Sequence, residues 1–236
     1  MSKAGDNILA ENANWSFGGN VADAFDVHVE KSVPFYHEGH QLVARIADFF
    51  LASGSVCYEL GCSTGRLMAV LAERNTHKSV RFVGIDNQEG MVEHARRRCG
   101  GFSSVTILQE DILSAQLEHA DLIISYYTIQ FIRPRWRQDV INRIYKALNW
   151  GGGFVMFEKV RAPDARFQDM MTTIYYDLKL EQGYTPEEIV GKARSLKGVL
   201  EPFSTQGNTG LLQRAGFVDF TTVFKYVCWE GFLAIK

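Results

Sequence analysis

One segment near residue 60 brings together residue types that bind a nucleoside ligand. The apolar run Val56–Leu60 leads into the turn Gly61–Gly65, and the following run Arg66–Arg74 has the character of a helix. A strand, a glycine turn and a helix in this order bring bare backbone amides against a ligand. A second apolar run, Val80–Ile85, ends in Asp86, an acid placed to accept hydrogen bonds from both hydroxyls of a ribose. Together the two segments predict a nucleoside-cofactor site.

The turn after the first strand narrows the cofactor class. It lacks the Gly-x-Gly-x-x-Gly pattern, so a dinucleotide with a pyrophosphate is disfavoured. It instead looks like the first motif of class I S-adenosylmethionine (SAM) enzymes, in which Glu59, Gly61, Cys62 and Ser63 would shape the loop around the amino-acid part of SAM. The alternative is a packing turn in another Rossmann-like protein. No His or basic residue is adjacent in sequence to Cys62, so we expect it to fit the loop sterically rather than act as a nucleophile.

Residues at the next two strand ends complete the predicted site. Asp86 would bind the ribose, and Asn87 would line the adenine. After the third strand, Asp111 is placed to accept a hydrogen bond from the adenine amino group, and Ile112 to pack on the ring. Glu110 fits a solvated acidic loop equally well.

Two pairs of tyrosines are candidates for the chemistry at the sulfonium. Tyr126 and Tyr127 leave the fourth strand, where an aromatic face beside a cation gains roughly 0.5–2 kcal/mol. Simple strand alternation would instead send one of them into the core and the other to the surface. Tyr175 and Tyr176 lie further along, and neighbours on a helix are about 100° apart, so only one of these two would point into a pocket. Packing of a cap is the alternative role for this second pair.

Alternating strands and helices would position these residues. The predicted strands are Val56–Leu60, Val80–Asp86, Val105–Gln109, Leu122–Tyr127, Gly153–Glu158, Phe217–Tyr226 and Trp229–Ile235, the last antiparallel. The predicted helices are Arg66–Arg74, Gln88–Arg98 and Arg135–Leu148, the last ending in a turn at Asn149–Gly153. We therefore predict an α/β, Rossmann-like, seven-stranded class I methyltransferase fold.

Two segments fall outside this alternation. Residues 1–55 precede the first strand and form a predicted N-terminal helical extension, while residues 56–236 form the SAM-binding domain. Residues 162–206 are a predicted helical insertion before the sixth strand. Both segments are expected to fold over the carboxyl edge of the sheet as a cap, because ligands of open α/β folds bind there and a covered site excludes water.

Bulk properties favour a small-molecule enzyme. The 236 residues carry a formal net charge of -2, and no long basic run suggests a nucleic-acid surface. The four cysteines show no metal-ligand spacing, and neither a signal core nor a membrane-length apolar run is present. We therefore expect a reduced, cytoplasmic protein that contacts neither membrane nor nucleic acid. His37 and His40 are three apart but have no further partner of suitable spacing, so no metal is predicted.

From about Trp15 to Lys236, the chain resembles the carboxy-SAM synthases, a branch of the class I SAM enzymes. The shared motifs are Trp15-x-Phe17, Lys31-Ser-Val-Pro-x-Tyr36, Leu60-Gly-Cys-Ser63, Ile85-Asp-Asn87, Glu110-Asp-Ile112, Thr128-x-Gln-Phe131, Leu148-Asn-x-Gly-Gly152, Glu158-Lys159, Gly183-Tyr184, Ala215-Gly-Phe217 and Leu233-Ala-x-Lys236. The resemblance implies a homodimer that converts SAM, using prephenate, into carboxy-SAM for modification of tRNA wobble uridine. By position it implies cofactor contacts from Tyr36, Gly61, Cys62, Ser63, Asp86, Asn87, Asp111 and Ile112.

Two positions depart from that family. Where its members have an Asn that helps to bind the modified cofactor, this chain has Tyr126. Where they have an Arg that pairs with the extra carboxylate, it has Ala193, with Arg194 one residue later. One residue rotates a helical side chain by about 100°, and losing a bidentate Arg removes a strong contact. A one-residue bulge would restore Arg194 as the substrate-binding residue.

Four functions are compatible with these residues. The main prediction is methyl transfer from SAM to a small nucleophile, an in-line displacement in which Tyr126 or Tyr176 would cradle the sulfonium or position the acceptor. A close alternative is cyclisation of SAM alone, in which its amine attacks its own γ-carbon and releases methylthioadenosine and azetidine-2-carboxylate. Carboxy-SAM synthesis comes third because of Tyr126 and Ala193. A SAM-sensing module without activity is the fourth.

Overall fold

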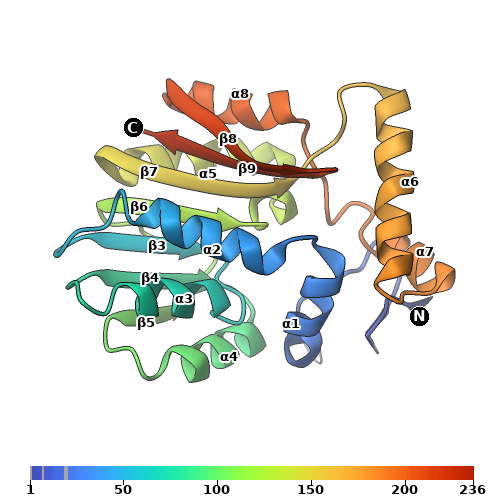
Figure 1. Cartoon of the computed structure of the whole chain (residues 1–236), viewed down its shortest axis with the longest axis horizontal. Helices are drawn as coiled ribbons and strands as arrows, with labels where there is room; N and C mark the ends of the chain where they lie inside the picture. The colour runs from blue at the N-terminus through green and yellow to red at the C-terminus, as the bar shows by residue number, and fades with distance from the viewer. Residues whose placement is uncertain (1, 7, 19–20) are drawn as a thin grey trace.

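A seven-stranded sheet forms the centre of the computed structural model (Figure 1), which describes every residue except 1, 7, 19 and 20. Its strands are β3 (Val56–Leu60), β4 (Arg81–Asp86), β5 (Val105–Gln109), β6 (Ala120–Tyr126), β7 (Leu148–Lys159), β8 (Asp219–Tyr226) and β9 (Trp229–Ile235). Their spatial order is β5-β4-β3-β6-β7-β9-β8. The first five are parallel, and β9 runs antiparallel to both of its neighbours, which confirms the predicted seven-stranded sheet.

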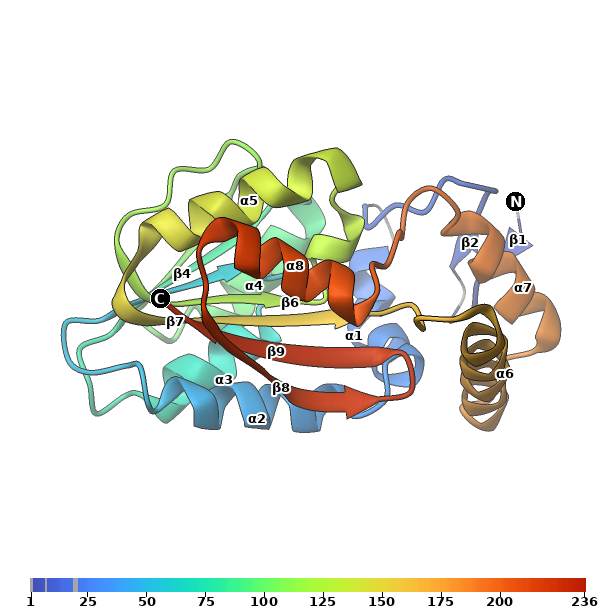
Figure 2. The ribbon, with the colours of Figure 1, turned by 90° about the horizontal axis from the view of Figure 1, so that it is seen from above.

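Helices cover both faces of the sheet (Figure 2). One face carries α2 (Tyr36–Ala47), α3 (Arg66–Arg74) and α4 (Glu89–Cys99), and the other carries α5 (Pro134–Ala147) and α8 (Thr205–Ala215). In β6, Leu122 and Ile124 pack in the first core and Ile123 in the second, so side chains that alternate along the strand supply both layers. A strand buried on both sides reads as a continuous apolar run, which is why β6 was recognisable from sequence.

Two parts of the predicted alternation were wrong. Residues Asn149–Gly153 do not leave the helix as a turn but belong to β7, where Gly151 has a φ of 77° and the pairing jumps from Ala120–Leu148 to Leu122–Gly153. The extra residues form a bulge that glycine tolerates, so the strand continues through them. The sequence also gave no sign of α8, because two glycines lower its helix propensity. Packing of Leu211 and Leu212 stabilises that helix instead.

The cap lies at the carboxyl ends of the parallel strands, where Figures 1 and 2 show α6 (Ala165–Glu181) standing across the end of the sheet. The cap's other elements are β1 (Ser2–Lys3), β2 (Leu9–Ala10), α1 (Val21–Ser32) and α7 (Pro186–Ser195). Backbone hydrogen bonds join the N-terminal segment to the end of α7, from Ala13 to Arg194 and from Trp15 to Ser195. The N-terminal extension and the insertion therefore form one cap, although α2 itself packs beside α3 on the sheet.

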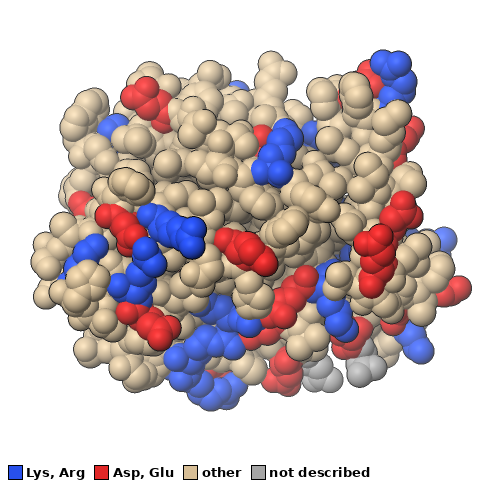
Figure 3. Space-filling view, in the orientation of Figure 1, with Lys and Arg blue, Asp and Glu red and all other residues tan. Residues whose placement is uncertain are grey.

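The surface and the helices add two general observations. On the face drawn in Figure 3, basic and acidic side chains are intermixed rather than segregated by sign. Among the described residues, no helix has the length and apolar character that crossing a membrane requires.

Candidate active site

A cavity of about 930 Å³ lies between the carboxyl edge of the sheet and the cap. This volume is at the upper end of the range for sites that bind small molecules. Its walls come from the turn after β3, the tip of β4, the loops after β5 and β6, and the cap helices. The short helix η1 (Ile129–Phe131) closes one side, with Gln130 and Phe131 in the wall.

The turn after β3 is held in a conformation that exposes its backbone. Gly61, Ser63 and Gly65 have φ values of 77°, 50° and 75°, and the amides of Gly61 and Cys62 both donate to the carbonyl of Ile85. A Cβ on Gly61 would lie 2.3 Å from Thr128 Oγ1. The residue must therefore be glycine, which leaves bare backbone beside the cavity as predicted.

Asp86 joins this turn to the tip of β4. The backbone N–H groups of Ser63 and Gln88 each donate to one of its carboxylate oxygens over 2.9 Å. Burial raises the pKa of Asp86, and the backbone hydrogen bonds oppose that rise. Its carboxylate is thus fixed at the cavity wall, at the place where a ribose diol would meet it.

Glu59 supplies a buried acid behind the same turn. It is 3% exposed, lines the cavity, and its Oε2 has no hydrogen-bond partner among the described residues. Burial, reinforced by the nearby Asp86 carboxylate, raises its pKa well above the ordinary value. A buried polar atom without a partner is costly, and the ammonium group of an amino-acid ligand would satisfy it. The glycine cradle and Glu59 together fit SAM.

The other predicted cofactor residues are distributed along the same wall. Asn87, Asp111 and Ile112 line the cavity, whereas Glu110 does not. The Asp111 carboxylate accepts a hydrogen bond from the Leu113 amide over 2.8 Å, which fixes its loop. These positions agree with the predicted arrangement, although their contacts to a cofactor stay a prediction.

Cys62 is placed as a packing residue of the turn. It is 2% exposed, and burial raises the pKa of its thiol well above the ordinary value. A thiol that stays protonated is a poor nucleophile, which supports the expectation that Cys62 fits the loop sterically.

Aromatic rings form the inner wall of the cavity. The ring centroid of Tyr126 lies 5.3 Å from that of Tyr36 and 4.7 Å from that of Tyr127, and Tyr127 lies 5.1 Å from Trp229. All four residues line the cavity. Tyr127 has a φ of 61°, which breaks the strand alternation, so both tyrosines reach the site. The sequence argument missed Tyr127 and Trp229 because it assumed regular alternation after β6.

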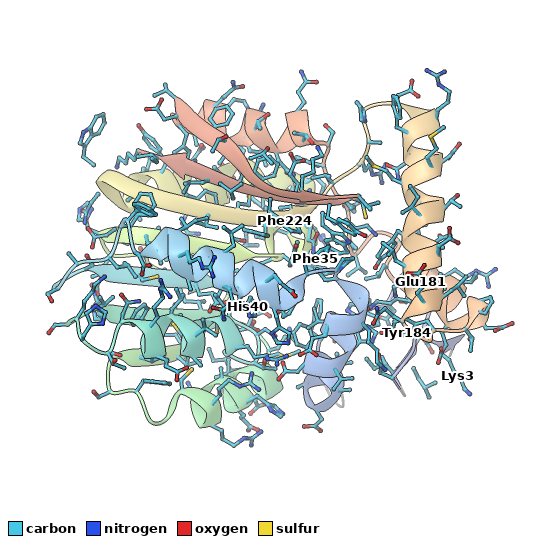
Figure 4. All side chains as sticks on the ribbon, viewed as in Figure 1. Lys3, Phe35, His40, Glu181, Tyr184 and Phe224 are labelled. Atoms are coloured by element: carbon cyan, nitrogen blue, oxygen red, sulfur yellow. The ribbon has the colours of Figure 1, made fainter. Side chains whose placement is uncertain are left out.

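His40 lies directly behind these rings, on α2 (Figure 4). Its ring centroid is 4.6 Å from that of Tyr36 and 4.7 Å from that of Tyr126. Burial lowers the pKa of His40 to about 3, so the imidazole is neutral, and its Nε2 has no partner among the described residues. His40 therefore adds a neutral, unpaired ring to the wall.

The second tyrosine pair divides between the cavity and its rim. The Tyr175 hydroxyl donates to the Ser32 carbonyl over 2.9 Å, and its ring lies 5.9 Å from Trp229. Tyr176 is 38% exposed and borders the cavity. Tyr175 is thus the packed member of the pair, in line with the 100° separation of helical neighbours.

Arg194 does not reach the cavity. Its side chain is exposed and lies in a shallow outer groove with Lys3 and Glu187, whereas Ala193 lines the cavity. The helix α7 contains no bulge that would turn Arg194 inward. The substrate-binding role considered for Arg194 therefore finds no support in its position.

Three lysines in the cavity wall were missed by the sequence argument. Lys159 ends β7, Lys179 lies on α6 and Lys192 on α7. They are 33 residues apart from first to last by number, and no local spacing marks them as neighbours. Within the described part of the chain, no group of three His, Cys, Asp or Glu side chains is arranged to hold a metal ion.

The sheet order and the cofactor cradle define a SAM-dependent enzyme of the class I methyltransferase type. A family model described as a methyltransferase domain matches residues 58–152. An O-methyltransferase family protein from Burkholderia thailandensis superposes with a TM-score of 0.65 at 15% identity, over 92% of this chain and 59% of that one. Human N-acetylserotonin methyltransferase, solved with SAM, gives 0.62 at 19% identity, over 91% and 54%. At such identities these structures show the fold alone.

Sequence relatives define the family more closely. Carboxy-S-adenosyl-L-methionine synthase from Staphylococcus epidermidis is 37% identical over 226 residues, which cover 94% of this chain and 97% of that protein. The enzyme of the same name from Sulfurimonas denitrificans is 35% identical over 223 residues, 94% of each chain. The chain belongs to the carboxy-SAM synthase family.

Proposed function

We propose that this protein consumes SAM as its sole substrate and closes it into azetidine-2-carboxylate. The amine nitrogen of SAM attacks the γ-carbon of its own methionyl chain, a new C–N bond forms and the bond from that carbon to sulfur breaks. The electron pair of the broken bond stays on sulfur, and neutral methylthioadenosine leaves. The nitrogen must be unprotonated when it attacks, so a nearby group has to take its proton.

Glu59 is the observation that carries this proposal. It is a buried carboxylate with a raised pKa and an unpartnered oxygen, behind the turn that would hold the methionyl part of SAM. A carboxylate with a raised pKa is a stronger base than an exposed one, and in a site of low dielectric a neutral acid and a neutral amine compete well with an ion pair. Glu59 therefore is placed to accept the proton that the amine must lose.

The family's grip on a second carboxylate is missing from the cavity. Ala193 occupies the wall where the resemblance implies an Arg, and Arg194 lies outside. Tyr126, at the position of the implied Asn, contributes an aromatic ring. These replacements favour a reaction without carboxylate transfer, while the aromatic wall suits a sulfonium.

One experiment tests the reaction. Purified protein is incubated with SAM alone and the products are identified by mass spectrometry. Methylthioadenosine and azetidine-2-carboxylate in equal amounts are expected, and a Glu59→Gln variant should form both far more slowly. Intact SAM after many hours, at a concentration that saturates the protein, would contradict the proposal.

Methyl transfer to an anionic small molecule is the second candidate, because Lys159, Lys179 and Lys192 line the cavity. In that case SAM alone stays intact, and an added acceptor yields S-adenosylhomocysteine. Carboxy-SAM synthesis, the activity in the relatives' name, would instead require prephenate and add mass to SAM. The same assay therefore separates the three reactions.

We also propose a homodimer in a reducing, cytoplasmic setting. Phe167, Met170 and Ile174 lie at helical spacing on α6 and are 50%, 59% and 47% exposed, an apolar stripe that suits a second copy of the chain. All four cysteines are buried thiols, which suits a reducing compartment. Light scattering of the wild type and of an Ile174→Glu variant tests the assembly, and a monomeric wild type would refute it.

A further inference from the structure

Three ammonium groups from separate elements line one part of the cavity. Lys159 comes from the end of β7, Lys179 from α6 and Lys192 from α7. Aromatic rings link them, because the Tyr175 ring centroid lies 4.1 Å from Lys159 Nζ and 5.8 Å from Lys179 Nζ. The cap thus gathers three positive charges around one tyrosine.

No carboxylate within the described residues lies within 4 Å of any of these three nitrogens. Lys179 is 3% exposed and makes no hydrogen bond through Nζ to the described chain. Lys192 Nζ contacts only neutral groups, the Ser32 hydroxyl at 3.0 Å and the His28 ring. Charged groups this buried are normally paired, so an anion is missing from the protein's own side chains.

The nearest acid is committed elsewhere. One Asp6 oxygen accepts from Lys31 over 2.7 Å, and the other accepts from the Tyr184 hydroxyl over 2.7 Å and lies 2.8 Å from His28 Nδ1. Figure 4 shows Tyr184 where α6 and the N-terminal segment meet. Asp6 therefore organises the outer side of the cluster and leaves the cavity side to a ligand.

The pKa values of the lysines agree with an incomplete site. Burial lowers the pKa of Lys179 to about 8, and it lowers that of Lys192 well below the ordinary value, with each ammonium adding to the effect on its neighbour. A bound anion would reverse this by pairing with the charges. The cation–π contacts orient the lysines without neutralising them.

We propose that Lys159, Lys179 and Lys192 form a carboxylate-binding subsite of the active cavity. The proposal rests on the SAM site and deepens the proposed function. The carboxylate has two sources, the α-carboxylate of SAM itself or a second small acid bound beside SAM. If SAM supplies it, the subsite turns the methionyl chain so that its amine faces the γ-carbon, and if a second acid does, the subsite selects that co-substrate.

Calorimetry on the full-length protein tests the subsite with four probes: SAM, decarboxylated SAM, S-adenosylhomocysteine and malonate. Lys179→Met and Lys192→Met remove the charges and keep the chain length, and Lys3→Met in the outer groove is the matched control. If SAM supplies the carboxylate, each cavity variant loses at least about tenfold in SAM affinity but not in affinity for decarboxylated SAM. If a second acid does, SAM affinity is kept, and malonate binding to protein saturated with S-adenosylhomocysteine is lost.

Either result supports a carboxylate subsite, and unchanged affinity for all four probes in both folded variants would overturn it. Circular dichroism and thermal unfolding establish that the variants fold. The product assay with SAM alone is scored separately. Azetidine formation by variants with unchanged affinities would leave the proposed function standing without the subsite, whereas carboxylate binding by a protein that leaves SAM intact would do the reverse.

Discussion

The hydroxyl of Tyr126 donates a hydrogen bond to the backbone carbonyl of Tyr36 over 2.8 Å. This bond ties the end of β6 to the first residue of α2, so it fixes two walls of the cavity to each other. Gly39 makes the approach possible, because a Cβ there would lie 2.0 Å from the hydroxyl. Tyr126 therefore offers the cavity its ring, while its hydroxyl is already used in holding the wall.

Tyr126→Phe separates these two roles. We expect the variant to lose about 1 kcal/mol of unfolding free energy, the net value of a partly buried hydrogen bond, and to keep most of its SAM affinity because the ring remains. Denaturant unfolding and calorimetry measure the two quantities. Tyr145→Phe, on the opposite face of the sheet, is the control. A loss of SAM turnover of 10²-fold or more in Tyr126→Phe, with unchanged affinity, would instead make the hydroxyl a reacting group.

Gly61→Ala tests the backbone cradle. The substitution places a Cβ 2.3 Å from Thr128 Oγ1 at a φ of 77°, so we expect SAM binding to weaken by at least tenfold. Gly54→Ala is the matched control, since Gly54 has a φ of 92° and open space around its Cβ position. The control carries the backbone strain, about 1 kcal/mol, without the clash. Equal SAM affinities in the two variants would remove the special role of Gly61.

The sequence predicted the cofactor side of this site far better than the reacting side. Glu59, Gly61 and Asp86 sit at strand ends and in a turn, where local pattern dictates position. Whether Arg194 faced the cavity depended on the rotation of α7, and the meeting of Lys179 with Lys192 depended on how two cap helices fold together. Such contacts between distant segments leave no periodic trace in one sequence. The family resemblance located the departures at Tyr126 and Ala193 but not what replaces them.

Glu59→Gln tests the proton acceptor of the proposed cyclisation. Gln keeps the shape but cannot take a proton, so we expect turnover of SAM at pH 7 to fall by about 10²-fold or more. Part of that loss should be regained at high pH, where the amine of SAM loses its proton to solvent. Steady-state kinetics across pH separate this effect from a change in KM. A variant with the wild-type turnover at pH 7 would exclude Glu59 as the base.

Glu158 provides a test of stability against pH. It is 2% exposed, its Oε1 has no partner among the described residues, and burial raises its pKa from 4.5 to about 8. The folded protein therefore holds a proton that the unfolded chain releases between these values, so this group's contribution to stability is full below pH 4.5 and is lost as the pH rises to about 8. Each unit of displacement is worth about 1.4 kcal/mol, which makes the decline a few kcal/mol. Glu158→Gln carries no such proton, so its melting temperature relative to the wild type should increase from pH 5 to pH 8. Glu181→Gln, at an exposed position, is the control and should follow the wild type. Parallel melting curves for the wild type and Glu158→Gln over that range would show that Glu158 ionises normally in the folded protein.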